Sequence, residues 1–409
     1  MDRRLYWIWL QLALRPGNPC ANTILEHFSS PEEVYAADGA ILQNAGIKEQ
    51  DAQRLLAKSG EASLEAAKSL FKTYADLGCW MLTPDDACYP MLLRGIYAPP
   101  LVLYGLGTPP VSADEPAIGM VGTRESSRYG DAAASRLAAG LAAGGMTVIS
   151  GGARGIDAAS HEAAMRAGGR TVAVQACGLD LEYPAENTDM RRRILQSGGM
   201  LLTEFPPGLK AYARNFEIRN RLISGMALGI CVVEAPVRSG ALITARHARE
   251  QGRDVFAVPG EIQSPLSRGA HHLIQEGAHL VTDACEILEE YTLQYGERLD
   301  YDAAARAQSA YPEPAWDTAP KRAKAAPASR PAKPHKPEPP AAKKSAGICP
   351  EDASPEARAV FAVLTDSPQH IDVLAQETGL TAARTMAALT ELEINGAAVE
   401  TGAQTYTRI

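Results

Sequence analysis

The chain has 409 residues, a formal net charge of −8 and a hydrophobic fraction of 46%. This length accommodates roughly two to four globular domains, and the negative charge excludes a nucleic-acid partner held by overall basicity, so any such surface has to be local. Seven scattered cysteines without a CxxC pair indicate a reducing compartment, and no zinc-type spacing of cysteines and histidines occurs.

Residues 1–75 have the pattern of a small helical domain. The apolar stretch at the start is interrupted by Gln11 and ends at Arg15, which favours a buried helix over a signal peptide. Residues 41–56 (ILQNAGIKEQDAQRLL) resemble a SAM-like or helix-hairpin-helix module, with a helical cap packed on the main domain as the alternative. Residues 16–47 are poor in basic residues, which weakens the case for a DNA contact there.

Residues 76–292 alternate between short apolar runs and helical patterns such as 129–145 and 240–252. This alternation is typical of a parallel sheet covered on both faces, so we predict an α/β fold with a doubly wound parallel sheet. The predicted strands are 117–122, 146–150, 170–176, 199–205, 228–235 and 254–260.

Residues 300–350 are rich in Pro, Ala and Lys and predict an extended linker, whose lysines are either merely solvated or in contact with phosphates. Residues 351–409 predict three helices, with Gly379 in the turn between the last two, and a hairpin, which is the winged-helix plan. Arg384 is the single base of the predicted recognition helix, so contact with DNA and contact with protein both stay open. No stretch reaches the ~18 apolar residues of a membrane span, and we expect a cytoplasmic protein.

Candidate binding residues follow the ends of the predicted strands. Ligands of open parallel sheets bind beyond the carboxyl ends of the strands and at helix N-termini, so these loops are expected to converge on one edge. Glycine-rich turns there present backbone N–H groups that suit an anion. The candidates are Gly122, Thr123, Arg124, Gly151, Gly152, Arg154, Gly155, Lys210, Arg214, Asn215, Phe216, Arg219, Asn220, Arg221, Ser239 and Gly240.

The side chains of these loops favour single-stranded nucleic acid. Lys210 is the sole lysine in 118–290, whereas arginines are frequent, and arginine suits bidentate phosphate contacts and stacking on bases. Phe216 stands between Arg214 and Arg219, and aromatic stacking contributes ~1–3 kcal/mol per base. Three alternatives stay open: the glycines merely form a tight turn, Phe216 is a core ring, and Arg219 and Arg221 pair with Glu217 and Glu204.

Two familiar phosphate-binding signatures and the common catalytic motifs are missing. The chain contains neither G-x-x-x-x-G-K-[ST] nor G-x-G-x-x-G, and neither Ser150 nor Ser239 lies in a G-x-S-x-G elbow. We therefore expect no catalytic residues, no metal and no cofactor.

Several long segments resemble the DNA-processing protein A (DprA, or Smf) family. They are GTR (122–124), SGGARGIDAASHEAA (150–164), NFEIRNRLISG (215–225), VVEAPVRSGALITARHAREQGRDVFAVPG (232–260) and SRGAHHLIQEGA (267–278), in this order. The strong resemblance spans about 80–290, and the terminal blocks resemble accessory domains of many members.

The resemblance implies an extended Rossmann-like core that binds single-stranded DNA and dimerises through that core. It also implies a role in natural transformation, in which the protein shields incoming strands and helps to load the RecA recombinase onto them. Arg124 and residues 215–221 would form the strand-binding pocket, with Phe216 stacking on a base, while the glycines of 150–157 and the Ser239–Gly240 turn would offer N–H groups to phosphates. Many members carry a basic residue three positions before the phenylalanine, where this chain has Ala213, and either Arg214 or Lys210 would replace it.

The wider superfold includes nucleotide-cleaving enzymes with a P-G-G-x-G-T-x-x-E motif. When this motif is laid over VRSGALITAR (237–246), Arg246 stands at the position of the glutamate. A nucleotide-binding hydrolase is therefore the alternative function, and it lacks its main carboxylate here.

Overall fold

The computed structural model describes residues 2–311, 353–367, 369–395, 397–402 and 405–408. The chain divides into two compact units, Met1–Lys324 and Ala325–Ile409, and each is treated separately below. The other domain boundaries expected from the sequence, near residues 75, 292 and 351, stay predictions.

The first unit is built on a nine-stranded sheet with the order β1-β2-β6-β5-β4-β3-β7-β8-β9. The seven strands β6, β5, β4, β3, β7, β8 and β9, in their order across the sheet, pair in parallel. At one edge, β2 pairs antiparallel with β6, and β1 pairs antiparallel with β2. The predicted fold class is confirmed, and all six predicted strands are present. The strands are β1 Trp80–Leu82, β2 Leu103–Gly107, β3 Ala117–Val121, β4 Thr147–Ser150, β5 Thr171–Val174, β6 Met200–Thr203, β7 Gly229–Val232, β8 Asp254–Ala257 and β9 His279–Leu280.

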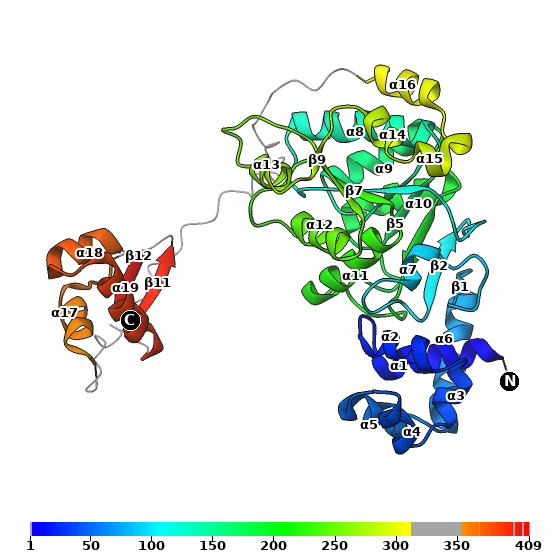
Figure 1. Cartoon of the computed structure of the whole chain (residues 1–409), viewed down its shortest axis with the longest axis horizontal. Helices are drawn as coiled ribbons and strands as arrows, with labels where there is room; N and C mark the ends of the chain where they lie inside the picture. Colours follow the sequence, from blue (N-terminus) through cyan, green and yellow to red (C-terminus); the bar gives the residue numbers. More distant parts are fainter. Residues whose placement is uncertain (1, 312–352, 368, 396, 403–404, 409) are drawn as a thin grey trace, which may run out of the picture. The chain divides into compact units, whose positions relative to one another are not determined.

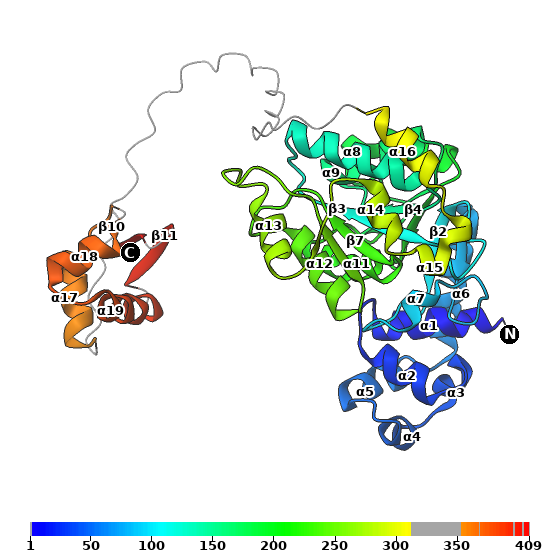
Figure 2. The same ribbon diagram turned by 45° about the horizontal axis from the view of Figure 1, so that its top comes forward.

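Helices cover both faces of this sheet (Figures 1 and 2). Alternate residues of each strand enter different apolar clusters: Ile118 and Met120 pack with α8, α9 and α14, whereas Ala117 and Val121 pack with α11, α12 and α13. The helices after β2 are α8 Arg128–Ala143, α9 Ile156–Arg166, α10 Thr188–Gln196, α11 Ala213–Gly225, α12 Gly240–Glu250, α13 Arg268–Gln275, α14 Ala284–Glu289, α15 Thr292–Tyr295 and α16 Tyr301–Ser309, with 3₁₀ turns at Ala185–Asn187 and Gly296–Arg298.

The order of the strands reverses between β3 and β7. The chain proceeds outward from β3 through β4, β5 and β6 on one side, and from β7 through β8 and β9 on the other. The loops that leave β3 and β7 therefore separate at their carboxyl ends and open a crevice, which is where doubly wound sheets bind ligands.

The prediction that the linker begins at residue 300 is wrong, because residues 301–309 form helix α16. Asp300 caps this helix, Ala304 is buried against the small-residue face of α8, and Gln308 donates to both carboxylate oxygens of Asp283 at 2.7 Å. The alanines of this segment thus form a packed helix, because alanine has the highest helix propensity and no proline interrupts residues 300–311. Residues 312–352 of the predicted linker lie outside the described residues.

The N-terminal helices pack onto the sheet beside α7 (Met91–Arg94), as Figures 1 and 2 show. Their apolar side chains share one cluster with Leu101, Tyr104 and Leu201 of the sheet unit. The Gln11 amide donates to the carbonyl of Glu204 at 2.7 Å and accepts from the N–H of Val102 at 2.6 Å. This packing favours the helical cap over an independent module. The helices are α1 Arg3–Leu14, α2 Cys20–His27, α3 Pro31–Ala36, α4 Gly39–Asn44, α5 Glu49–Ala57 and α6 Glu61–Asp76.

No helix within the described residues is long and apolar enough to cross a membrane.

The second unit has the predicted three helices and hairpin. Gly379 ends α18 with a φ of +69°, a conformation that favours glycine. Glu391 of α19 accepts hydrogen bonds from the N–H and hydroxyl of Ser354 at 2.7 and 2.6 Å, so this acid ties α19 to the start of α17. The elements are α17 Pro355–Val363, β10 Gln369–His370, α18 Ile371–Thr378, α19 Ala382–Ile394, β11 Ala398–Gly402 and β12 Thr405–Arg408.

A buried ion pair joins β6, α11 and the N-terminal helices. Arg221 donates to the carboxylate of Glu204, and both side chains are almost fully buried. Replacement Arg221→Met leaves this carboxylate buried without its charged partner and is expected to lower the free energy of unfolding by about 3–5 kcal/mol in urea titrations. Arg192→Met removes an exposed pair with Asp189 and is the control, with a loss of about 0.5 kcal/mol or less. Equal losses in the two variants would contradict the assignment.

Candidate nucleic-acid interface

A groove lies at the carboxyl edge of the parallel strands, at the crevice between β3 and β7. It consists of two adjoining hollows of about 360 and 290 Å³, which share Arg124, Ala153, Phe216 and Arg219. We call the pair the central groove. Its aromatic half is lined further by Gly151, Arg154, Gln175, Ala176, Glu182, Tyr183, Pro184, Ala185 and Glu186, and its cationic half by Val121, Gly122, Thr123, Asp157, Asn220, Ile223, Pro236, Arg238, Ser239, Gly240, Ala241 and Thr244.

Arg219 forms the floor of the groove. Its guanidinium donates to the carbonyl of Gly151 at 2.8 Å and to the carbonyl of Val174, and its Nε donates to the side-chain oxygen of Asn220 at 3.1 Å. Burial lowers the pKa of Arg219 to about 10, so the side chain keeps its positive charge at neutral pH. One buried cation thus joins the ends of β4 and β5 to α11.

Phe216 lies on the first turn of α11, half-buried, and lines both halves of the groove. The Arg124 guanidinium carbon is 4.9 Å from the centre of its ring, and that of Arg219 is 5.7 Å away. The Tyr183 ring is tilted against it with the centroids 5.8 Å apart. The arrangement argues against Phe216 as an ordinary core ring, since its ring borders open space and is flanked by two cations.

The glycine-rich turn after β4 encloses a carboxylate of the protein itself. The N–H groups of Gly151 and Ala153 donate to Oδ2 of Asp157 at 3.1 and 3.2 Å, and burial raises the pKa of this carboxyl group. The expectation that Gly151 offers its N–H to a phosphate is therefore corrected, because Asp157 already accepts that hydrogen bond. Gly152 and Gly155 line neither half of the groove.

Close approach explains two of these glycines. A Cβ atom on Gly151 would lie 2.6 Å from the Arg219 guanidinium, so the glycine leaves the space that this side chain fills. Gly155 has a φ of +73°, and a Cβ there would overlap the carbonyl oxygen of Thr123. The turn thus shapes the floor of the groove more than it supplies donors to it.

Three exposed arginines surround the groove. Within the described residues, Arg124, Arg154 and Arg238 form no ion pair, so their guanidiniums are available to a ligand. Arg124 and Arg154 are predicted site residues, whereas sequence reasoning missed Arg238 and Tyr183. Both follow predicted strands, in the segments EYP and APVRSG, so their position at strand ends was the available signal.

The structure separates some predicted residues from the groove. Arg221 is corrected: it is buried against Glu204 and has no access to a ligand. Asn215 donates to the carbonyls of Ala176 and Lys210, both at 3.1 Å, and thereby holds the loop before α11. Lys210 precedes α11 and Arg214 lies on its first turn; both are exposed, and neither lines the central groove. Five other predicted residues, Gly122, Thr123, Asn220, Ser239 and Gly240, line the cationic half.

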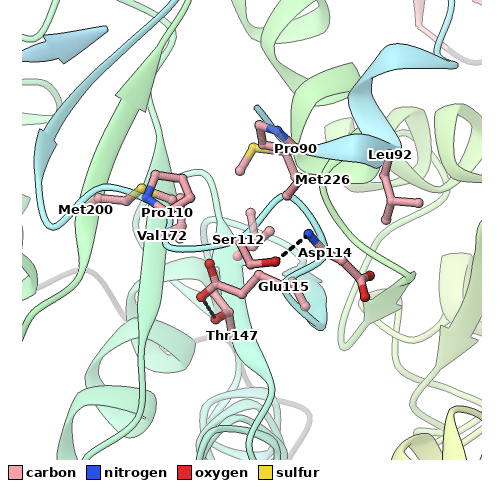
Figure 3. Close-up of a pocket in the computed structure, with 13 residues that line it drawn as sticks. Pro90, Leu92, Pro110, Ser112, Asp114, Glu115, Thr147, Val172, Met200 and Met226 are labelled. Carbon is pink, nitrogen blue, oxygen red and sulfur yellow. Dashed lines mark hydrogen bonds between the residues drawn. The ribbon is translucent and has the colours of Figure 1, made fainter. Parts of the chain in front are cut away.

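A second hollow lies at the opposite, amino edge of the strands (Figure 3). Its volume is about 30 Å³, room for little more than a water molecule. Its acids are engaged: Glu115 accepts from the Thr147 hydroxyl at 2.7 Å (Figure 3) and pairs with Arg170 at 3.1 Å. The Asp114 carboxylate accepts from the Tyr295 hydroxyl and lies 3.9 Å from Arg298, while its backbone N–H donates to the Ser112 hydroxyl (Figure 3). This hollow is a packing feature of the sheet.

Arg246 occupies the position at which the nucleotide-cleaving enzymes have their motif glutamate, and it forms ion pairs. Arg246 of α12 lies 3.7 Å from Glu217 and 3.8 Å from Glu250, and its side chain is 60% exposed. Glu217 therefore pairs with Arg246 rather than with Arg219. No group of three His, Cys, Asp or Glu residues that could hold a metal ion occurs within the described part of the chain.

Gly151→Ala is expected to disturb the groove through Arg219. The added methyl group overlaps a guanidinium that two carbonyls hold in place, so we expect a loss of about 1–3 kcal/mol in the free energy of unfolding, measured in urea. Gly95→Ala is the control, because a Cβ there meets nothing within 4 Å, and its effect should stay within about 0.5 kcal/mol. An unchanged stability of Gly151→Ala would contradict the close packing at Arg219.

Two protein-family models match the chain. The family described as DNA recombination-mediator protein A matches residues 80–292, and the DprA winged helix domain matches residues 331–403. The first match contains every residue that lines the central groove.

Known relatives agree with these matches. A relative from Mycobacterium tuberculosis that carries the DprA name is 45% identical over 223 residues, which are 51% of this chain and 57% of that protein, so the chain spans little more than half of this relative's length. The DNA processing protein DprA of Bacillus subtilis is 41% identical over 227 residues, which cover 55% of this chain and 76% of that protein.

A solved structure agrees as well. The X-ray structure of DNA processing protein A from Streptococcus pneumoniae matches with a TM-score of 0.57 and 34% identity, and the match covers 69% of this chain and 97% of that chain. The family match extends over more than half of the sequence and includes both the sheet and the groove. The chain therefore belongs to the DNA recombination-mediator protein A (DprA/Smf) family.

Proposed function

We propose that this protein binds single-stranded DNA in the central groove and acts there as a recombination mediator rather than as an enzyme. The observation that carries the proposal is the Phe216 ring, which borders open space between the guanidiniums of Arg124 and Arg219. A ring flanked by cations suits a stacked base with a phosphate on either side. The name of the family agrees with a mediator role.

The two halves of the groove suit the two parts of a nucleotide. The aromatic half holds Tyr183 and Phe216 and takes the base, while the cationic half, with Arg124 and Arg238, takes the phosphates. Stacking on an aromatic ring and contacts to phosphates do not distinguish one base from another, so binding is expected to tolerate any sequence.

We extend the proposal to the role that the resemblance to the family implies. The protein would shield single strands taken up in natural transformation, help to load the RecA recombinase onto them, and work in the cytoplasm as a homodimer formed through the Rossmann-like core. Support comes from the family match over residues 80–292 and from the DprA winged helix domain beyond it, which offers a further surface for DNA or protein.

Phe216→Ala tests the stacking contact. Loss of the ring is expected to weaken binding of a labelled single-stranded oligonucleotide by about 1–3 kcal/mol, or roughly 5- to 150-fold, in fluorescence anisotropy, and to slow RecA-dependent strand pairing in parallel. Tyr97→Ala removes a ring that is 70% exposed outside the groove and should leave the affinity unchanged. If Phe216→Ala binds like the unchanged protein, the base does not stack there.

Arg124→Gln tests the binding of a phosphate. The slope of log affinity against log salt is expected to flatten by about 0.7 for each phosphate of a single strand that the variant no longer binds, because fewer counterions are released. Arg249→Gln removes an arginine that pairs with Glu276 away from the groove and serves as the control of equal charge. An unchanged slope in Arg124→Gln, measured across the same salt series, would refute a phosphate contact at this residue.

A further inference from the structure

A third and larger hollow lies between the N-terminal helices and α11. Its volume is about 430 Å³, and we call it the lateral cavity. Apolar and aromatic side chains form its walls, and two arginines, one from each of the two blocks, stand among them. Its lining includes Leu12, Arg15, Tyr104, Phe205, Arg214 and Ile218.

Both arginines of the lateral cavity are exposed and unpaired. Within the described residues, neither Arg15 nor Arg214 forms an ion pair or a side-chain hydrogen bond. Arg15 ends α1 with a φ of +69° and a ψ of 153°, a region that residues other than glycine rarely adopt. A hollow with apolar walls and two free guanidiniums is complementary to a ligand that has a flat apolar body and anionic groups beside it.

The lateral cavity adjoins the aromatic half of the central groove. Asn215 lines the lateral cavity and donates to the carbonyl of Ala176, which lines the aromatic half, at 3.1 Å. Phe216 and Arg214 lie on the same first turn of α11, one on each side of Asn215. A strand that leaves the Phe216 ring and crosses this turn therefore meets Arg214 and the cavity behind it.

The N-terminal helices hold Arg15 in a fixed position relative to α11. The N–H of Gly17 donates to the buried Glu204 carboxylate, which also binds Arg221 of α11. A Cβ on Gly17 would lie 3.0 Å from the Ile218 side chain, so this loop and α11 are in close contact. The loop after α1 thus packs against α11, and this packing places Arg15 beside the helix that carries Arg214.

We propose that the lateral cavity is a second nucleotide subsite for the same single strand, with a base against its apolar walls and the adjoining phosphates on Arg15 and Arg214. This proposal rests on the proposed function, because the strand enters from the Phe216 stack. It gives the N-terminal helices a direct part in binding, although residues 16–47 contain no lysine or arginine. The occupant is DNA rather than an acidic peptide, since the cavity lies just across the first turn of α11 from the groove that takes the first base.

The test uses the full chain and labelled oligothymidylates of increasing length. The unchanged protein is expected to gain affinity as the oligonucleotide becomes long enough to pass from Phe216 into the lateral cavity. In the double variant Arg15→Gln, Arg214→Gln this gain should shrink, because the two phosphate contacts are lost, and the salt slope for long oligonucleotides should flatten by about 0.7 for each phosphate that is no longer bound. Affinity for the shortest oligonucleotides should stay unchanged.

Two further variants keep the outcome decisive. Lys68→Gln removes an exposed charge of the same N-terminal block, paired with Glu65 outside the cavity, and should leave the length series unchanged. Arg15→Lys keeps the charge and should retain most of the salt slope. A double variant that follows the unchanged protein at every length overturns the lateral subsite, and the cavity then serves another partner. Phe216→Ala then separates the two proposals. If this variant loses affinity at all lengths, the central groove binds DNA and only the lateral subsite is refuted. If it loses none, the proposed function itself is refuted.

Discussion

The buried guanidinium of Arg219 is the group on which the groove depends. It ties the carbonyls of Gly151 and Val174, at the ends of two neighbouring strands, to the helix that carries Phe216. A buried cation is costly unless its donors are satisfied, and here three oxygens and the nearby Asp157 compensate for it. The glycine at residue 151 leaves room for this side chain. The aromatic ring is therefore held by the sheet rather than by a flexible loop.

A second buried charge organises the other side of α11. Glu204, at the end of β6, binds Arg221 of the helix and the N–H of Gly17, while Gln11 of α1 binds its carbonyl. Arg219 and Arg221 thus anchor the same helix to two different surroundings: Arg219 faces the central groove, and Arg221 faces the N-terminal helices. Both faces of the first turn of α11 then border open hollows, and this is the basis for a strand that crosses the turn.

The sequence predicts the parallel sheet well because its strands are apolar on both faces and alternate with helices. It does not reveal β1 and β2, because β2 (LYGLG) contains two glycines, which weaken strand preference, and Trp80 of β1 compensates by covering Gly105. Strand order makes the convergence of loops predictable. The roles of single arginines are not predictable from the sequence. Arg219 and Arg221 lie about 200° apart around the helix, and only the packing decides which one faces the groove. The helix at 301–309 had a readable signal, alanines after a capping aspartate, which the overall composition of the linker concealed.

The preference of the unchanged protein for single strands over duplex tests the central claim most directly. Fluorescence anisotropy would measure the affinity for labelled single-stranded and duplex oligonucleotides across a salt series. An assay for nucleotide turnover would run on the same sample. Together they distinguish a single-strand DNA-binding protein from a nucleotide hydrolase. We expect tight, salt-sensitive binding of single strands, weaker binding of duplex, and no turnover. Equal affinity for both forms of DNA, with release of base or phosphate from a nucleotide, would contradict the account and make the groove a substrate pocket.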